Sequence, residues 1–194
     1  VSSQATRSAS AIAALARYGY KVDTSVTPHL RWDDSTRENP VDFTRAPEQP
    51  YFTGGQDICS PNAEGPILEV PVSIALRKRK ILRELMVSAG GLRHRRRKYK
   101  PVWLRPYYST ADEMIAIADQ YYETHAGIEN LVLNMMFHNV EVLPSLSPYT
   151  RTEADCKDYM QQLRLFFSFC ARQGFSSIAL SGLHAIYQPE LSIK

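Results

Sequence analysis

Apolar and polar positions alternate in blocks along the chain, and the clearest block is a helical repeat near the C-terminal end. Apolar side chains recur there at spacings of three and four residues, which is typical of a helix that buries one face. The repeat comprises Cys156, Tyr159, Met160, Leu163, Phe166, Phe167 and Cys170. Thr152 and Asp155 before it form a capping-box pattern, and Gly174 is placed to end the helix. We therefore predict a long helix whose buried face includes both cysteines.

The other blocks predict helices and strands in alternation. A helix starting near Ser8 or Ser10 should end at Gly19, and Ser109 or Thr110 should cap another that runs to about His125. The apolar blocks predict strands at 20–26, 67–74, 102–104, 131–138 and 178–180. Between these elements we expect a polar loop over 27–66 and a basic helix over 76–89. This alternation favours a mostly parallel sheet, either a barrel or an open wound sheet, in one α/β domain over residues 1–194.

One histidine lies at the end of the most apolar predicted strand. His138 follows the run Leu131–Phe137 and precedes a polar loop that contains Asn139, Glu141 and Pro144. Barrel and open α/β enzymes present catalytic groups where a strand ends and a loop begins. Histidine is also the side chain best suited to exchange protons near neutral pH. His138 is therefore a candidate catalytic residue, and a hydrogen-bonded structural histidine is the alternative.

Composition is that of an ordinary globular domain. The 194 residues are 44% hydrophobic and 22% charged, with a formal net charge of +3. Three cysteines without metal-type spacing argue against a disulfide framework and favour a reducing compartment. No apolar run reaches the roughly 18 residues that span a bilayer, and no leader pattern follows Val1. We expect a cytoplasmic or membrane-peripheral protein that has been cut from a longer one.

Basic side chains concentrate in two clusters, at 77–83 and 93–100. Such clusters bind phosphates of nucleic acid or anionic lipid headgroups. No aromatic platform or nucleic-acid motif accompanies them, and the rest of the chain is nearly neutral. A solvated face is the first interpretation. Docking on an anionic membrane surface through Arg77–Lys80 and Arg93–Lys100 is the second, and nucleic acid is the less favoured partner.

Four segments follow one another in an order that resembles a known family. They are Ala13–Pro28, which contains Asp-Thr-Ser-Val-Thr-Pro from Asp23, then Arg45–Phe52, Ile67–Pro71, and Phe137–Tyr149, which contains Phe-His-Asn-x-Glu and Ser-Pro-Tyr. Their order and spacing resemble the polysaccharide deacetylases, a family of carbohydrate esterases, in the subgroup found in bacterial exopolysaccharide loci. The resemblance extends over nearly the whole chain, although each motif alone is weak.

The resemblance implies an incomplete, distorted (β/α) barrel with mostly parallel strands. It also implies hydrolysis of N-acetyl groups from a polysaccharide, assisted by a divalent metal, usually zinc. His138 would be the acid that protonates the leaving amine, and Asp23 would shape the pocket or its electrostatics, unless it is only structural. Trp32 is a candidate for stacking a sugar ring, with loop packing as the alternative. The other candidate substrate-binding residues are Phe137, Asn139 and Glu141.

The chain departs from the family in ways that bear on its activity. The family carries its aspartate pair and its His-x-x-x-His metal pair ahead of the region that matches Val1, and the five histidines here are widely scattered. We therefore assign no metal ligand and expect the C-terminal two-thirds of a deacetylase, inactive alone. Asn139 stands where the subgroup usually has Ser. The alternatives are a non-catalytic glycan-binding relative and a docking protein that uses its basic segments.

Overall fold

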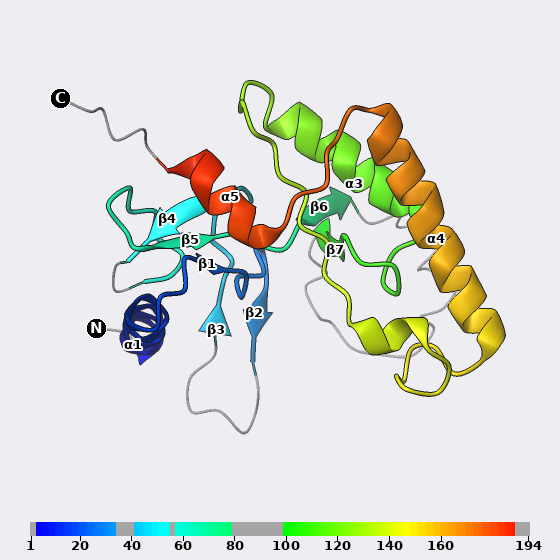
Figure 1. Cartoon of the computed structure of the whole chain (residues 1–194), viewed down its shortest axis with the longest axis horizontal. Helices are drawn as coiled ribbons and strands as arrows, with labels where there is room; N and C mark the ends of the chain where they lie inside the picture. Colours follow the sequence, from blue (N-terminus) through cyan, green and yellow to red (C-terminus); the bar gives the residue numbers. More distant parts are fainter. Residues whose placement is uncertain (1–2, 34–40, 55–56, 79–98, 189–194) are drawn as a thin grey trace.

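Three small β-sheets form the frame of the protein in the computed structural model, which describes residues 3–33, 41–54, 57–78 and 99–188 (Figure 1). The first sheet has the order β1-β5-β4, with β1 at Val22–Asp23, β5 at Ile67–Glu69 and β4 at Tyr51–Thr53. The second pairs β2 (Arg31–Trp32) with β3 (Val41–Asp42). The third pairs β6 (Ile74–Lys78) with β7 (Tyr99–Trp103).

The predicted barrel of mostly parallel strands is wrong. Among the described strands, β1 and β5 make the one parallel pair, with Asp23 in register with Glu69. The pairs β4–β5, β2–β3 and β6–β7 are all antiparallel. A barrel needs a single sheet that closes on itself, whereas these sheets have two or three strands each. The fold is therefore mixed α/β with small, mostly antiparallel sheets.

Four α-helices and one 3₁₀ helix accompany the described strands. They are α1 (Ser3–Arg17), α3 (Ala111–Thr124), η1 (Asn139–Val142), α4 (Glu153–Arg172) and α5 (Leu180–Tyr187). The predicted capping box at Thr152 forms, and Thr110, one of the two predicted caps of α3, forms one as well; each threonine accepts from the backbone N–H three residues later. Past the end of α4, Gly174 adopts a φ of +82°, a conformation that most other residues avoid. The predictions of α3 and α4 are confirmed.

The predicted strand ending at His138 does not form. Residues 131–138 are held by side chains, and not by a neighbouring strand. The amide of Gln49 bonds both the N–H and the C=O of Val132, at 2.9 and 3.1 Å. Ser73 and Asn134 bond each other twice, at 2.8 and 2.9 Å. These contacts satisfy backbone groups that a strand ladder would otherwise use.

Four further element predictions differ from the structure. The expected strand at 67–74 is interrupted, because β5 ends at Glu69 and β6 starts only at Ile74. The predicted basic helix begins within β6, and its residues 79–89 lie outside the described part. The predicted strand at 178–180 is instead the approach to α5. The predicted loop at 27–66 contains three short strands, β2, β3 and β4.

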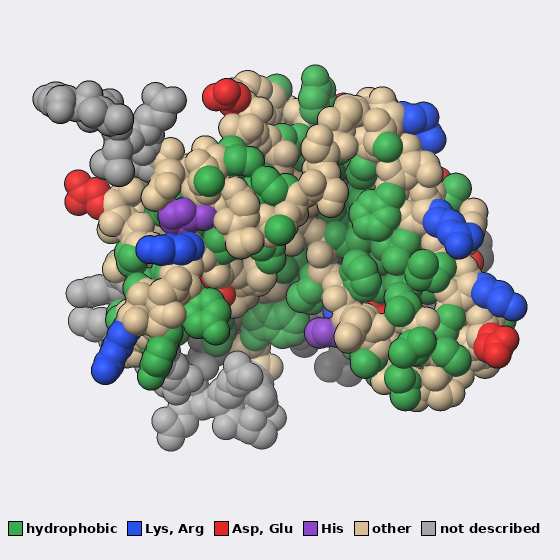
Figure 2. Space-filling model, in the orientation of Figure 1, with side chains coloured by type: hydrophobic (Ala, Val, Ile, Leu, Met, Phe, Trp, Pro, Cys, Tyr) green, Lys and Arg blue, Asp and Glu red, His purple; other side chains and the backbone are tan. Residues whose placement is uncertain are grey.

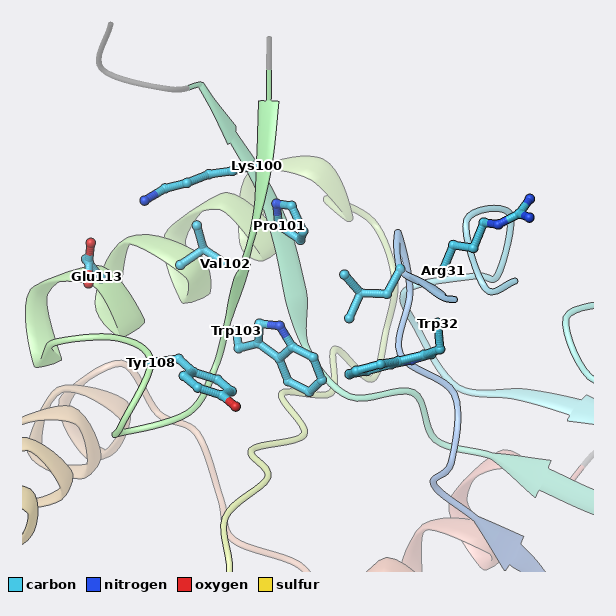
Figure 3. A pocket seen from close by; sticks show the side chains of 9 residues that line it. Arg31, Trp32, Lys100, Pro101, Val102, Trp103, Tyr108 and Glu113 are labelled. Atoms are coloured by element: carbon cyan, nitrogen blue, oxygen red, sulfur yellow. The ribbon is translucent and has the colours of Figure 1, made fainter. Parts of the chain in front are cut away.

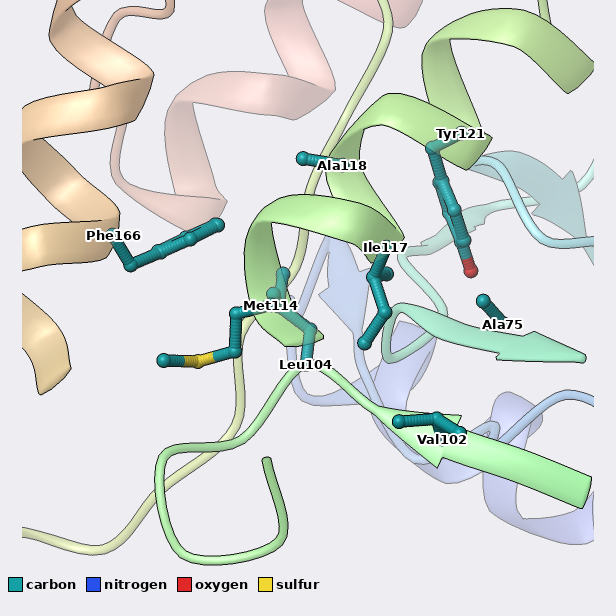
Figure 4. Packing of buried hydrophobic residues seen from close by; sticks show 8 residues of the cluster. All are labelled: Ala75, Val102, Leu104, Met114, Ile117, Ala118, Tyr121 and Phe166. Atoms are coloured by element: carbon teal, nitrogen blue, oxygen red, sulfur yellow. The ribbon is translucent and has the colours of Figure 1, made fainter. Parts of the chain in front are cut away.

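The largest apolar cluster joins the hairpin β6–β7 to the two longest helices (Figure 4). Its members come from β6, β7, the turn after β7, α3 and α4: Ala75, Val102, Leu104, Met114, Ile117, Ala118, Tyr121 and Phe166. The hydroxyl of Tyr121 accepts from the N–H of Ile74 at 2.9 Å and donates to its C=O at 3.2 Å. Hairpin and helices are therefore fixed together by burial and by a buried polar contact.

Two smaller clusters hold the other sheets and helices. One is formed by α1 and its neighbours, with Ile12, Val26, Phe43, Ala46, Ile58 and Ile67. The other packs α5 on the first sheet through Leu68, Val70 and Leu183. Cys156 on α4 is buried and Cys170 is partly buried, as predicted, and burial raises the pKa of the Cys170 thiol.

Hydrophobic side chains also gather on the surface, over η1 and α4 (Figure 2). Large apolar side chains of these two elements that are more than a third exposed are Val140, Met160, Leu165 and Phe167. Within the described residues, none of the helices has the length and apolar character needed to cross a membrane.

Candidate functional site

A groove of about 370 Å³ lies between the strand β2 and the strand β7 (Figure 3). Residues 30–32 form one wall, residues 100–103 form the other, and Tyr108 and Glu113 complete it. The two walls come from different sheets, so the groove exists only when those sheets are placed side by side. Its floor is mainly aromatic and its rim is charged.

Aromatic rings follow one another along this groove in edge-to-face contacts. Trp32 meets Trp103 with ring centroids 6.2 Å apart, and Trp103 meets Tyr108 at 5.9 Å. Tyr108 in turn contacts Tyr107 and Tyr149, at 5.5 and 6.3 Å. We call Trp32, Trp103 and Tyr108 the aromatic row. About half of the surface of Trp32 and of Tyr108 is exposed, so their faces are available to a ligand.

Trp32 is fixed in place by a hydrogen bond. Its indole N–H donates to Oγ1 of Thr27 at 2.9 Å, and the Thr27 residue is buried. Tryptophan with a bonded N–H and an exposed ring is pre-oriented, so little side-chain entropy is lost when a ligand stacks on it. The predicted sugar-stacking position of Trp32 therefore lies in a groove, beside a second tryptophan.

A buried ion pair lies behind the aromatic row. Arg105 donates from Nη2 to Oε1 of Glu141, and Oε2 of Glu141 accepts from the hydroxyl of Tyr159 at 2.8 Å. The guanidinium also lies over the rings of Tyr108 and Tyr149, 4.8 and 5.2 Å from their centroids. Burial, followed by the bond to Glu141, raises the pKa of Tyr159. Glu141 therefore has a structural role, because it binds the guanidinium of Arg105 that lies against the ring of Tyr108.

Burial excludes direct contact between Glu141 and a ligand. Its side chain has no exposed surface, whereas the sequence predicts a substrate-binding residue. The contacts nevertheless connect it to Trp32, through Arg105, Tyr108 and Trp103. The structure thus links two of the predicted residues by a continuous series of contacts, in which Glu141 supports the row.

His138 lies at the start of η1, and its side chain is exposed. Its C=O accepts from the N–H of Glu141 at 2.9 Å, which ties the histidine to the buried ion pair. Asn139, the next residue, is also exposed. Phe137 is 37% exposed and packs edge-to-face on Tyr159, with centroids 6.2 Å apart. These three predicted residues are neighbours, and their described contacts place none of them in the groove of Trp32.

Asp23 lies elsewhere, at the end of β1, beside a buried carboxyl. Glu69 has no exposed surface, and its Oε1 accepts from the N–H of Val26 at 3.0 Å. Its Oε2 is buried and has no hydrogen-bond partner among the described residues. Burial, reinforced by the charge of Asp23, raises the pKa of Glu69 to about 9. Asp23 itself accepts from Ser25 Oγ at 2.6 Å. At neutral pH Glu69 is therefore a neutral acid next to Asp23.

A second carboxylate joins two histidines from distant parts of the chain. Oε1 of Glu48 accepts from Nε2 of His29 at 2.5 Å, and Oε2 accepts from Nε2 of His125 at 2.8 Å. Burial raises the pKa of Glu48, but the bonds to His29 and His125 outweigh it and lower the pKa overall. His29 has a φ of +67°, which is uncommon for a residue other than glycine. We call Glu48 with its two histidines the Glu48 clasp. It connects the segment before β2 with the end of α3.

The described residues do not fit the zinc that the family resemblance implies. A zinc site needs three or four nitrogen, sulfur or oxygen ligands around one point. In the ranges that the structure describes, no three His, Cys, Asp or Glu side chains are grouped in that way. We therefore derive no catalytic step through a metal.

Sequence reasoning missed most of the groove. Trp103, Arg105, Tyr107 and Tyr108 stand together in the segment Trp-Leu-Arg-Pro-Tyr-Tyr, directly after the second basic cluster. An aromatic platform thus does follow that cluster, contrary to the sequence-based interpretation. The density of aromatic residues around a single arginine was the available signal. Within the basic clusters, Arg77, Tyr99 and Lys100 have described side chains, and residues 79–98 lie outside the described part.

Comparisons with protein-family profiles, with curated proteins and with solved structures found no match to this chain.

Proposed function

We propose that this chain binds a polysaccharide that contains N-acetylated sugars, by stacking sugar rings on the aromatic row. The observation that carries the proposal is the pair Trp32 and Trp103, two indoles from different sheets in one open groove. Sugar rings have apolar C–H faces, and they associate with exposed aromatic faces while their hydroxyl groups bond to the rim. Around the row, Arg31, Lys100 and Glu113 supply such polar groups.

The chain offers a direct readout of this binding. Its only two tryptophans are Trp32 and Trp103, and both line the groove. Intrinsic tryptophan fluorescence therefore reports on the groove alone. Titration with oligomers of N-acetylglucosamine should shift the emission and give a saturable binding curve, whereas oligomers of glucose test the contribution of the acetamido group.

Substitutions in the row separate this function from a merely structural role. Trp32→Ala and Trp103→Ala should each weaken binding about tenfold or more, because each removes a stacking surface worth about 1.4 kcal/mol. Binding is then followed by calorimetry, since each variant loses a fluorophore. Tyr122→Ala is the control, because Tyr122 is 70% exposed on α3 and lies outside the groove. Affinity that stays unchanged in both tryptophan variants would overturn the proposal.

Hydrolysis of the N-acetyl group is the second candidate function, with His138 as the group that protonates the leaving amine. The observation that favours it is the exposed imidazole on a segment tied to the buried Glu141 and Arg105. A positioned imidazolium contributes about a hundredfold or more to such a proton transfer. Acetate release from N-acetylated oligosaccharides, measured with and without added zinc, should fall at least a hundredfold in His138→Ala. Equal release by His138→Ala and by the unaltered chain would remove His138 from this role.

A further inference from the structure

Two cations stand opposite each other in the hairpin β6–β7, and one of them, Lys100, lines one end of the groove. In the hairpin β6–β7, Arg77 is directly opposite Lys100. Side chains of opposite residues in an antiparallel pair project from the same face, and like charges in such positions repel. Lys100 also lines the groove, on the same strand as Trp103 (Figure 3).

The described residues do not neutralise this pair. Among their ion pairs, none includes Arg77 or Lys100. Glu113 lies at the same end of the groove, but its carboxylate accepts from the N–H of Thr110 at 3.1 Å in the capping box. Within the described residues, Arg77 and Lys100 are therefore cations without a described counter-ion.

The other end of the groove is electrically different. Arg31 is bonded to Asp33 at 2.9 Å and lies 3.8 Å from Asp42. Those two carboxylates satisfy the guanidinium before any ligand arrives. An anionic ligand is therefore favoured at Lys100, whereas the Arg31 end suits neutral hydroxyl groups.

We propose that the groove selects an acidic polysaccharide and holds a carboxylate of its uronic acid units at Lys100 and Arg77. The proposal rests on the proposed glycan binding and adds the charge of the ligand to it. An arginine and a lysine together donate to both oxygens of a carboxylate. Lys100 and Trp103 project from opposite faces of β7 but both line the groove (Figure 3), so an oligosaccharide along the edge of β7 can place an acidic unit at Lys100 and a neighbouring sugar on Trp103. Alternating neutral N-acetylated and acidic sugars fit this arrangement.

The test compares two oligosaccharides of equal length. Hyaluronan hexasaccharide alternates N-acetylglucosamine with a uronic acid, and chitohexaose consists of N-acetylglucosamine alone. At about 0.05 M salt, tryptophan fluorescence should report at least tenfold tighter binding of hyaluronan. The preference should shrink at about 0.5 M salt, because mobile ions screen an exposed charge contact.

Variants that remove a positive charge test whether the preference for hyaluronan depends on Lys100 and Arg77. Lys100→Gln and Arg77→Gln should each lower hyaluronan affinity several-fold, and the double variant should bring it to the chitohexaose value. Chitohexaose affinity should stay unchanged in Arg77→Gln and should fall much less than hyaluronan affinity in the two variants that lack Lys100, because a neutral chain keeps its stacking contacts and loses only a hydroxyl contact there. Lys157→Gln is the matched control, because Lys157 is exposed on α4, away from the groove. Normal thermal unfolding of each variant verifies that it folds.

The outcomes separate the two proposals. Equal affinity for the two oligosaccharides, weakened equally by Trp103→Ala, would overturn the charge selection and leave glycan binding in place. No binding of either would overturn both. Binding of phosphatidylserine vesicles that needs Lys100, without preference for hyaluronan, would replace the polysaccharide with an anionic membrane surface.

Discussion

Arg105 and Glu141 form an ion pair inside the protein, where Arg105 is 4% exposed and Glu141 has no exposed surface. The pair joins the turn after β7 to η1, and the guanidinium supports the ring of Tyr108 from below the groove. Nε of Arg105 is buried without a hydrogen-bond partner in the structure. The pair therefore depends on Glu141 and on the surrounding rings to offset the cost of burying a charge.

Removal of either partner should destabilise the protein strongly. Glu141→Gln keeps the size of the side chain but leaves Arg105 buried without a counter-charge, which costs about 3–5 kcal/mol. Arg105→Met leaves Glu141 uncompensated in the same way. Urea unfolding gives the free energies, and the double variant should lose less than the sum of the two single losses. Losses below about 1 kcal/mol in both single variants would contradict a buried pair.

Replacement of Glu69 by Gln should stabilise the protein at alkaline pH. The folded-state pKa of Glu69 is about 9, above its ordinary value of 4.5. Its stabilising contribution is therefore fully present below about pH 4.5 and is lost as the pH rises toward 9. At pH 7 the burial costs roughly 3 kcal/mol, because each pKa unit is worth about 1.4 kcal/mol.

Glu69→Gln keeps an acceptor for the N–H of Val26 and cannot ionise. The free energies of unfolding of the two proteins should converge near pH 4.5 and diverge steadily up to pH 9. Glu64→Gln is the control, since Glu64 is exposed. Parallel pH profiles for Glu69→Gln and the unaltered protein would show that Glu69 is ionised in the folded state.

Replacement of Glu48 by Gln should act at the other end of the pH scale. The pKa of Glu48 is lowered by its two histidines, so its contribution is present above about pH 4.5 and is lost on acidification through its folded-state pKa. Near pH 6 the variant should lose about 1–3 kcal/mol, because charge-assisted bonds become neutral ones.

Acid unfolding followed by circular dichroism measures this effect. Between pH 5 and 3 the stability of Glu48→Gln should fall less steeply than that of the unaltered protein. Glu129→Gln provides the comparison, because Glu129 is exposed beyond α3. An unchanged acid slope in Glu48→Gln would mean that the clasp carries no net charge interaction.

Removal of the Tyr121 hydroxyl should loosen the hairpin β6–β7 from α3. This hydroxyl bonds both backbone groups of Ile74, and the Tyr121 residue is 1% exposed. Tyr121→Phe leaves those groups without this partner and should cost about 1–3 kcal/mol. The neighbouring Tyr122→Phe, at an exposed position, should change stability by less than about 0.5 kcal/mol. Urea unfolding of the two variants gives the comparison, and equal effects would contradict the prediction.

Local signals predicted α3 and α4 well, whereas α1 begins earlier than predicted and α5 was not predicted. The capping threonines Thr110 and Thr152 and the glycine after α4 act over three or four residues, so the sequence around them contains the whole interaction. The apolar spacing of α4 predicts the buried positions Cys156, Tyr159, Leu163 and Phe166, but it is wrong for Met160 and Phe167, which are 37% and 51% exposed. Strand pairing has no such local signal, and the barrel expected from strand alternation and from the family resemblance is wrong for that reason.

The segment before His138 shows how tertiary contacts override an apolar run. Its residues read as a buried strand, yet Val132 is bonded by the side chain of Gln49 and Asn134 by Ser73. Those partners stand far away in the sequence, and no periodicity near His138 indicates them. The apolar run therefore predicted a buried strand that does not form, and residues 131–136 are only partly buried.

The sequence likewise predicted only part of the candidate site. From the sequence alone, Trp32 was a candidate for sugar stacking, and the positive charge near Lys100 was evident. The contact between Trp32 and Trp103 was decided by the packing of two sheets, and the position of Lys100 opposite Arg77 by the pairing of β6 with β7. Helices and their caps come from contacts between near neighbours along the chain, which the sequence determines by itself. A groove between sheets comes from contacts between distant residues, which only the tertiary structure brings together.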